Sequence, residues 1–222
     1  GLNRNSIKKN WDRNKFIALE LASSDKIVAP TKWQREQLPT ILSQHCEVIF
    51  DGIDLDFYRI NLLSRNSTPL LTYGTRGMDP FRGFPQFIKS LPQILSNNKN
   101  LKVEIAGNST VFYGSYPKGF DNWQTWAIDY LKRNKIDKKV SWKGFMDPND
   151  YLKWLQSSWC HVYLTHPFVA SWSMVESLAC GSHLIASDIE ATREFCGEMD
   201  GVSLVDHRVI DQIVHCVNSV IA

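Results

Sequence analysis

The chain has 222 residues, and its content of 43% hydrophobic and 22% charged residues is ordinary for a folded globular protein, which argues against intrinsic disorder. Its 25 basic and 23 acidic side chains give a formal net charge of +2, too balanced to indicate nucleic acid or an anionic membrane as the main partner. No stretch approaches about 20 apolar residues, so no segment is predicted to span a bilayer.

Apolar runs of strand length alternate with helix-period segments along nearly the whole chain. Several of these runs are apolar throughout, as in strands that are covered on both faces. Such alternation predicts an α/β protein with a Rossmann-like, doubly wound parallel sheet. The expected strands are 26–29, 70–73, 102–106, 140–142, 161–164, 183–186 and 202–205.

The expected helices have recognisable starts. Thr31 can cap a helix over 32–43, and Asp121 or Asn122 can cap one over 123–134. Asp147 and the proline after it can open a further helix, with the proline at its first position. Segment 83–95 has apolar residues at helical spacing, although Pro92 counts against a helix there.

Two segments interrupt this alternation. Residues 51–69 contain turn signals and a polar stretch without periodicity, which indicates a linker. Residues 108–122 are rich in Gly, Ser, Tyr and Pro, and we expect a long loop after a strand, where parallel sheets bind ligands. Aromatic residues in and after this loop could line an acceptor cleft or pack locally, and we favour packing for Tyr113, Tyr116, Phe120, Trp123 and Trp126.

The five cysteines are widely spaced and include no C-x-x-C pair, so we expect buried free thiols in a reducing compartment. Histidines and cysteines at 160, 161, 166, 180 and 183 fit no standard zinc spacing, and no metal site is predicted. The first residues lack an apolar signal core, and there is no initiator methionine. We therefore expect a piece of a cytoplasmic protein, with peripheral attachment to the inner membrane face as a further option.

The segment YGTRGMDPFRGF, residues 73–84, carries the first chemical signal. A strand, a glycine-bearing turn with Gly74 and Gly77, and a helix N-terminus together form an anion site. Arg76 and Arg82 add two permanent cations whose forked donors suit the oxygens of a diphosphate. A surface turn with two solvated arginines is the alternative interpretation.

The second signal lies in HPFVASWSMVESLACGSHLIASD, residues 166–188. Ser171 or Ser173 can cap a helix that ends near Gly181, leaving amides free to meet a phosphate. Glu176, one turn into this helix, could accept hydrogen bonds from ribose hydroxyls, or it could simply be favoured by the helix dipole. An unpaired glutamate in so apolar a helix would be costly, which favours the functional interpretation.

These two segments, in this order, resemble the C-terminal domain of retaining glycosyltransferases of the GT-B fold, the glycosyl transferases group 1 family. In that family a Gly–Arg turn, followed by a basic residue and a glycine, grips the donor diphosphate, as Arg82 and Gly83 would here. The family's later Glu-Ala-x-Ala-x-Gly string, whose glutamate binds ribose, is matched by residues 176–181.

The resemblance extends to both ends of the chain. Residues 140–146 resemble the strand and turn before the nucleotide base, which implies base contacts from Gly144, Phe145 and Met146. Residues 25–54 resemble the end of the N-terminal domain and the interdomain linker. The resemblance therefore implies a remnant of the N-terminal domain plus linker over 1–60, and a nucleotide-sugar-binding domain, one half of a GT-B fold, over 61–222.

The resemblance implies a metal-independent, cofactor-free hexosyltransferase that acts with retention of configuration. We expect the donor to be UDP-glucose or another UDP-hexose. The acceptor would be a polysaccharide or a lipid-linked carbohydrate, bound through the absent N-terminal domain. Arg76 and Arg82 would be the catalytic residues. The donor would be bound by Gly74, Arg76, Arg82, Gly144, Phe145, Met146, Ser171, Trp172, Ser173, Met174 and Glu176.

One position departs from the family pattern. The family carries a Glu-x7-Glu pair whose second member corresponds to Glu176, but the first is replaced here by Phe168. Two alternatives therefore stay open. The first is a nucleotide-sugar-binding module without catalysis, and the second is a nucleotide-sugar epimerase of the related fold, for which the sequence offers few acid–base groups beyond His166.

Overall fold

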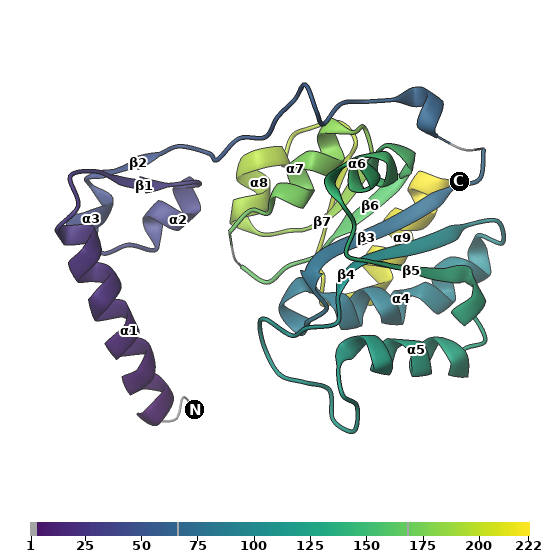
Figure 1. Cartoon of the computed structure of the whole chain (residues 1–222), viewed down its shortest axis with the longest axis horizontal. Coiled ribbons are helices and arrows are strands. Elements are labelled where there is room, and N and C mark those ends of the chain that lie inside the picture. Colours follow the sequence, from purple (N-terminus) through teal and green to yellow (C-terminus); the bar gives the residue numbers. More distant parts are fainter. Residues whose placement is uncertain (1–3, 66, 168) are drawn as a thin grey trace. The chain divides into compact units, whose positions relative to one another are not determined.

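A computed structural model describes residues 4–65, 67–167 and 169–222. The chain divides into two compact units between Asp51 and Gly52 (Figure 1). Residues 52–60, which the sequence assigns to the linker, therefore cluster with the larger second unit. No helix in these ranges is long and apolar enough to cross a membrane.

From residue 4 onward, the smaller unit consists of a two-stranded parallel sheet with three helices. Its elements are α1 (Arg4–Ala22), β1 (Ile27–Ala29), α2 (Lys32–Glu36), α3 (Thr40–Ser43) and β2 (Cys46–Val48). Thr31 caps α2 as predicted, accepting a hydrogen bond from the amide of Gln34 at 2.9 Å. The single helix predicted over 32–43 is wrong, because Pro39 has no amide hydrogen and its ring clashes with a preceding helical turn, so a new helix starts after it.

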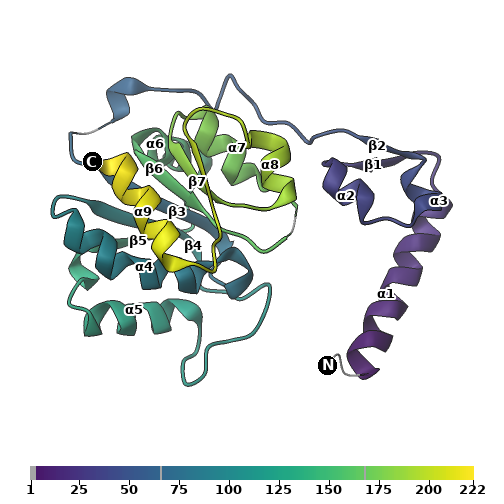
Figure 2. The ribbon, with the colours of Figure 1, turned by 180° about the vertical axis from the view of Figure 1, so that it is seen from behind.

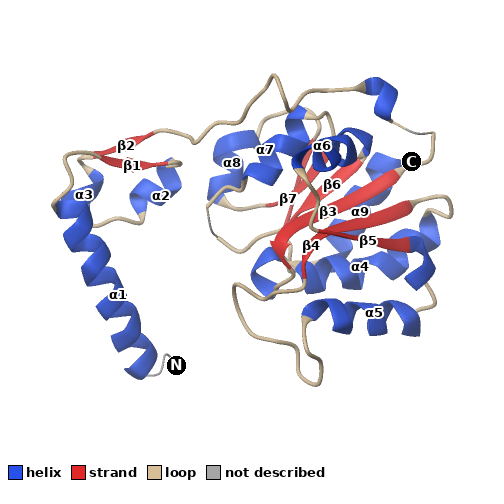
Figure 3. Ribbon diagram, in the orientation of Figure 1, coloured by secondary structure: helices blue, strands red, loops and turns tan. Residues whose placement is uncertain are grey.

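The larger unit contains a six-stranded parallel sheet (Figure 3). Its strands are β3 (Leu70–Gly77), β4 (Lys102–Asn108), β5 (Val140–Gly144), β6 (Cys160–Tyr163), β7 (His183–Ser187) and β8 (Val202–Val205). The spatial order is β5-β4-β3-β6-β7-β8. Counted from β3 along the chain, this order is 3-2-1-4-5-6, which is the Rossmann order and confirms the predicted fold class.

Helices cover both faces of this sheet, as a doubly wound fold requires. One face carries α4 (Phe84–Asn97), α5 (Trp123–Arg133) and α9 (Ile210–Ile221), and Figure 2 shows α9 on it. The other carries α6 (Pro148–Ser157), α7 (Trp172–Ala179) and α8 (Glu190–Cys196). Asn122 and Asp147 cap α5 and α6 as predicted. The sequence analysis did not identify α1, β2, α8 or α9.

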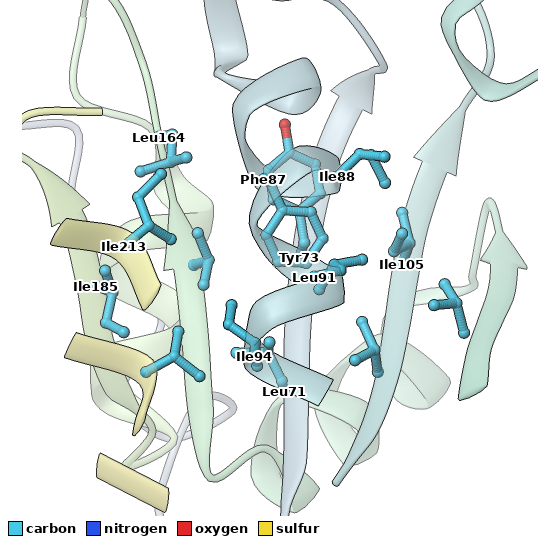
Figure 4. Packing of buried hydrophobic residues seen from close by; sticks show 14 of the residues in the cluster. Leu71, Tyr73, Phe87, Ile88, Leu91, Ile94, Ile105, Leu164, Ile185 and Ile213 are labelled. Carbon is cyan, nitrogen blue, oxygen red and sulfur yellow. The ribbon is translucent and has the colours of Figure 1, made fainter. Parts of the chain in front are cut away.

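The main core lies between the sheet and the α4 face (Figure 4). Phe87 and Leu91 of α4 are fully buried against Leu71 and Tyr73 of β3. Pro92 lies inside α4 without ending it, because a proline costs one hydrogen bond and local clash, about 3 kcal/mol, whereas the apolar face of this helix is buried over its whole length. Four of the five cysteines are buried, and all five are free thiols.

Gly107 allows β3 and β4 to approach closely beside the carboxyl edge of the sheet. Its φ of +122° is rarely adopted by other residues, and an added Cβ would lie 1.8 Å from the carbonyl oxygen of Thr75. This oxygen belongs to the irregular part of β3, where the register with β4 shifts between Gly74 and Gly77.

Substitution of Gly107 is expected to destabilise the fold more than substitution of a glycine in open space. Gly107→Ala combines backbone strain with a backbone clash, and we expect it to lower the free energy of unfolding by about 3 kcal/mol or more. Gly201→Ala is the control, because Gly201 has a φ of +79° but no atom near its Cβ position. It should cost about 1–2 kcal/mol. Urea unfolding followed by circular dichroism measures both, and equal losses would contradict a limiting contact at Thr75.

Candidate functional site

The candidate site lies where the direction of chain progression through the sheet reverses. From β3 the chain moves outward through β4 and β5, and then returns to place β6 on the other side of β3. Loops after β3 and β6 therefore leave in opposite directions and open a crevice at the carboxyl edge, which is where α/β sheets bind ligands. Both motifs singled out in the sequence follow these two strands.

Arg82 bridges the two sides of this crevice. Its Nη1 atom donates to the hydroxyl of Tyr163 at 3.4 Å and to Oγ1 of Thr165 at 3.3 Å, both at the end of β6. The hydroxyl of Tyr73, on β3, donates to the Arg82 carbonyl oxygen at 2.7 Å. The guanidinium is only partly buried, so its position is defined while part of its surface faces solvent.

The turn before Arg82 differs from the prediction. We expected β3 to end at Tyr73, but the strand continues through an irregular stretch to Gly77, since Gly74 and Gly77 both pair with β4. The turn itself is a short 3-10 helix, Pro80–Arg82, followed by Gly83 with φ +62°. A Cβ at Gly83 would lie 2.4 Å from Cβ of Leu164, so this glycine permits the approach of the two loops.

Asp79 is a site residue that sequence reasoning missed. Its side chain is buried at 1% exposure and accepts hydrogen bonds from the amides of Arg82, at 3.2 Å, and Tyr113, at 3.4 Å. Burial raises the pKa of this carboxyl, and the amide hydrogen bonds oppose that rise. The available signal was the Asp-Pro pair in the motif, which is typical of a cap before a helical turn.

Arg76 is exposed and lies beside the loop that follows β4. Its guanidinium carbon is 4.3 Å from the ring centroid of Phe112, within the range of a cation–π contact. The long loop predicted over 108–122 is present. Of the aromatic residues in and after this loop, Tyr113 lines the cavity described next, whereas Trp123 and Trp126 of α5 pack against the main core.

A cavity of about 530 Å³ joins these elements. This volume falls within the usual range for small-molecule sites. The structure brings eight of the predicted residues to its wall: Gly74, Arg76, Arg82, Gly144, Phe145, Met146, Ser171 and Ser173. Residues lining it that sequence reasoning did not assign to the site include Tyr58, Asp79, Asn108, Phe112, Tyr151 and Tyr163.

Three predicted residues do not line this cavity. Trp172 is 57% exposed at the start of α7, and Met174 is fully buried in the core between α7 and the sheet. Glu176 is half-buried and is not among the residues that line the cavity. Phe168, the position of the missing first glutamate, lies outside the described residues.

The start of α7 is organised differently from the expected serine cap. Ser171 occupies the N-cap position, but its hydroxyl pairs with that of Ser173 at 3.0 Å and not with a helix amide. The amide of Ser171 instead donates to the hydroxyl of Tyr163 at 3.2 Å. Tyr163 thus connects Arg82 with the start of α7, because its hydroxyl oxygen accepts from both.

Glu176 is paired, contrary to the argument that favoured a functional role for it. Its Oε2 accepts a hydrogen bond from the Tyr151 hydroxyl at 3.0 Å. Burial raises the pKa of Glu176, and the hydroxyls of Tyr151 and Tyr58 act in the opposite direction. The sequence could not reveal this, because the three residues come from three separate segments.

The part of the chain that the structure describes contains no candidate metal site. Within the described residues, no three His, Cys, Asp or Glu side chains lie close enough together to hold an ion. His161 is fully buried on the central strand β6, where its Nδ1 pairs with Oγ1 of Thr72 on β3 at 2.8 Å. Burial lowers the pKa of this imidazole to about 4, so it is neutral at physiological pH.

Comparison with solved structures finds the same fold in glycosyltransferases. HepE from Anabaena, in complex with UDP and glucose, is 13% identical with a TM-score of 0.73, over 88% of this chain and 53% of that one. Sucrose-phosphate synthase from Thermosynechococcus elongatus is 17% identical with a TM-score of 0.72, over 93% of this chain and 52% of that one. This chain thus spans about half the length of these two proteins.

A third solved structure is itself a C-terminal domain. It is the C-terminal domain of LpcC, a glycosyl transferase group 1 family protein from Francisella tularensis, which is 18% identical with a TM-score of 0.64, over 77% of this chain and 88% of that one. A comparison with curated protein sequences found no match.

Family profiles account for both parts of the sequence. The profile described as glycosyl transferase family 4 group matches residues 4–58. The profile described as glycosyl transferases group 1 matches residues 66–222, which is most of the chain. The chain therefore belongs to the glycosyl transferases group 1 family, and its larger unit is the C-terminal domain of a GT-B fold.

Proposed function

We propose that this chain is the donor-binding part of a glycosyltransferase that takes its sugar from a nucleotide-diphosphate sugar. The observation that carries the proposal is the convergence of Arg76, Arg82 and the start of α7 on one cavity at the switch point of the sheet. A diphosphate needs fixed cations, and this cavity presents the guanidinium groups of Arg76 and Arg82 beside the N-terminal end of α7, where the helix dipole favours an anion.

Within this cavity each residue has an expected task. Arg76 and Arg82 would stabilise the negative charge that grows on the leaving oxygen when the glycosyl–diphosphate bond breaks. Backbone amides at the start of α7, near Ser171 and Ser173, would bind the phosphates. Gly144, Phe145 and Met146 would contact the base, and Glu176 belongs to the region that meets the ribose. Loss of one catalytic donor should cost about 2.7–4 kcal/mol of transition-state stabilisation.

UDP-glucose or another UDP-hexose is the donor that we propose. HepE of the same fold has been crystallised with UDP-glucose, and TarM of Staphylococcus aureus with UDP. Transfer with retention and without a metal follows from the family resemblance, with the arginines in place of a divalent cation. The acceptor would be a polysaccharide or a lipid-linked carbohydrate, met by the part of the two-domain protein that this chain lacks, at the cytoplasmic side of a membrane.

A second candidate is a nucleotide-sugar-binding module without catalysis. It is favoured by Phe168, which stands where the family pattern has a carboxylate near the donor sugar. Turnover of UDP-glucose by the two-domain protein, with and without acceptor, separates the two functions. Sugar transfer supports the enzyme, donor binding without any turnover supports the module, and epimerised donor would support the third alternative.

Nucleotide preference can be measured on this chain directly. UDP at a hundredfold excess over its dissociation constant should add about 2.7 kcal/mol of apparent stability. We expect UDP and UDP-glucose to raise the midpoint of thermal unfolding, and ADP, GDP and their sugar conjugates to raise it less. A clear preference for a purine nucleotide would contradict the uridine assignment but not the diphosphate site.

Arg82→Ala should weaken UDP binding by about 10- to 100-fold, since hydrogen bonds to charged groups contribute about 1.5–3 kcal/mol. Arg82→Lys should restore only part of the affinity, because a lysine keeps the charge and loses the forked donors. Arg133→Ala is the matched control, since Arg133 pairs with Asp129 on the exposed side of α5. Isothermal titration calorimetry measures all three, and unfolding without ligand checks that the fold is intact. Unchanged affinity in Arg82→Ala would reject the site.

A further inference from the structure

The two arginines at the cavity wall are held in different ways. The Arg82 guanidinium donates to two side-chain hydroxyls, those of Tyr163 and Thr165. The Arg76 guanidinium makes no hydrogen bond or ion pair with a described residue, and its carbon atom lies over the ring of Phe112, 4.3 Å from the ring centroid. An aromatic ring in the loop after β4 thus takes the place beside Arg76 that hydroxyls have beside Arg82.

A ring contact suits an arginine that has to bind an anion. The face of an aromatic ring carries partial negative charge and attracts a guanidinium. The ring offers no oxygen acceptor, so the N–H donors of Arg76 stay available for phosphate oxygens. The contact also restricts a long, flexible side chain before a ligand arrives, which lowers the entropy that binding would cost.

The ring of Phe112 is packed against the strand that carries Arg76. A Cβ at Gly77 would lie 2.4 Å from Cδ2 of Phe112 and 2.4 Å from the carbonyl oxygen of Thr110. The absence of a side chain at Gly77 therefore lets the ring lie directly on the backbone of β3, one residue after Arg76. The same glycine pairs with Asn108 at the end of β4, so the strand and the start of the loop are joined there.

The loop that carries Phe112 is held at two further points. The Tyr113 amide donates to Oδ2 of Asp79 at 3.4 Å. The carbonyl oxygen of Ser115 accepts a hydrogen bond from Nε1 of Trp123 at 2.9 Å. The backbone on the far side of Phe112 is thus held in place, although its side chain is 41% exposed.

We propose that Phe112 is a positioning residue that holds the Arg76 guanidinium at the cavity wall through the face of its ring. Both residues line the cavity, so the guanidinium can meet a ligand there. The loop after β4 thereby belongs to the site, although it lies outside the two motifs that the sequence singled out. The inference rests on the proposed function and deepens it, because Arg76 can stabilise a leaving diphosphate only from a defined position.

A double-mutant cycle tests the coupling between the ring and the arginine. Phe112→Leu should weaken UDP binding to the whole chain about two- to fivefold in titration calorimetry, the size of an exposed cation–π contact. In an Arg76→Ala background the same substitution should have no effect, and in an Arg82→Ala background the loss should persist. Equal losses with and without Arg76 would mean that Phe112 contacts the ligand or supports the loop, and would overturn the proposal.

Ring electronics separate electrostatic attraction from packing. Phe112→Tyr keeps the electron-rich ring face and should bind UDP as wild type does. Pentafluorophenylalanine at position 112 keeps the ring shape and reverses the charge of its face, so it should bind UDP as weakly as Phe112→Leu. Wild-type affinity with the fluorinated ring would reject the proposal, because a packing role needs only the shape.

Phe16→Leu is the matched control. Phe16 is an exposed ring on α1, where the ammonium nitrogen of Lys15 lies 5.5 Å from the ring centroid, and it does not line the cavity. This variant should leave UDP affinity unchanged. Circular dichroism checks that each variant is folded before titration.

Failure of the proposed function gives a different result from failure of this inference. If the wild-type chain binds no UDP, or if Arg76→Ala and Arg82→Ala both bind it normally, the donor site is wrong and the inference falls with it. If UDP binding needs both arginines but does not respond to the ring at position 112, only the positioning role of Phe112 is rejected.

Discussion

The rest of the site depends on the hydrogen bonds of Arg82 to Tyr163 and Thr165. These bonds join the loop after β3 to the loop after β6, at the point where the strand order of the sheet reverses. Because the chain winds outward from β3 and returns on its other side, the two following loops diverge and leave a crevice between them. Arg82 connects these loops, while Gly83 lets them approach and Tyr73 holds the arginine backbone from the strand below. A permanent cation is thereby fixed at the wall of the cavity. The proposed stabilisation of a leaving diphosphate would require such a preorganised charge.

Several polar groups around the crevice are hydrogen-bonded to one another, and these bonds define its geometry. The Tyr163 hydroxyl accepts from Arg82 and from the amide of Ser171, so it ties the arginine to the start of α7. Asp79 accepts from two backbone amides and links the arginine turn to the loop after β4. An unpaired polar group at such positions would cost about 1–3 kcal/mol, so each bond also restricts the loops to one arrangement.

Much of the fold was predictable because local patterns agreed with the tertiary structure. All seven expected strands are present, since continuous apolar runs suit strands buried on both faces. Caps at Thr31, Asn122 and Asp147 were readable from residue type alone. The errors arose where a local signal was overlooked or was overridden by packing. Pro39 divides the expected helix over 32–43, whereas Pro92 is accommodated because the apolar face of α4 is buried on both sides of it.

By itself the sequence determined the α/β class, the two motifs and the cationic character of the candidate site, because these depend on residue type and short-range spacing. The tertiary structure alone decided which side chains meet. It placed Arg82 against Tyr163 and Thr165, buried Met174 in the core, and paired Glu176 with Tyr151. Contacts between segments so far apart in the chain depend on strand order and on the direction in which each helix crosses the sheet, which no local pattern encodes.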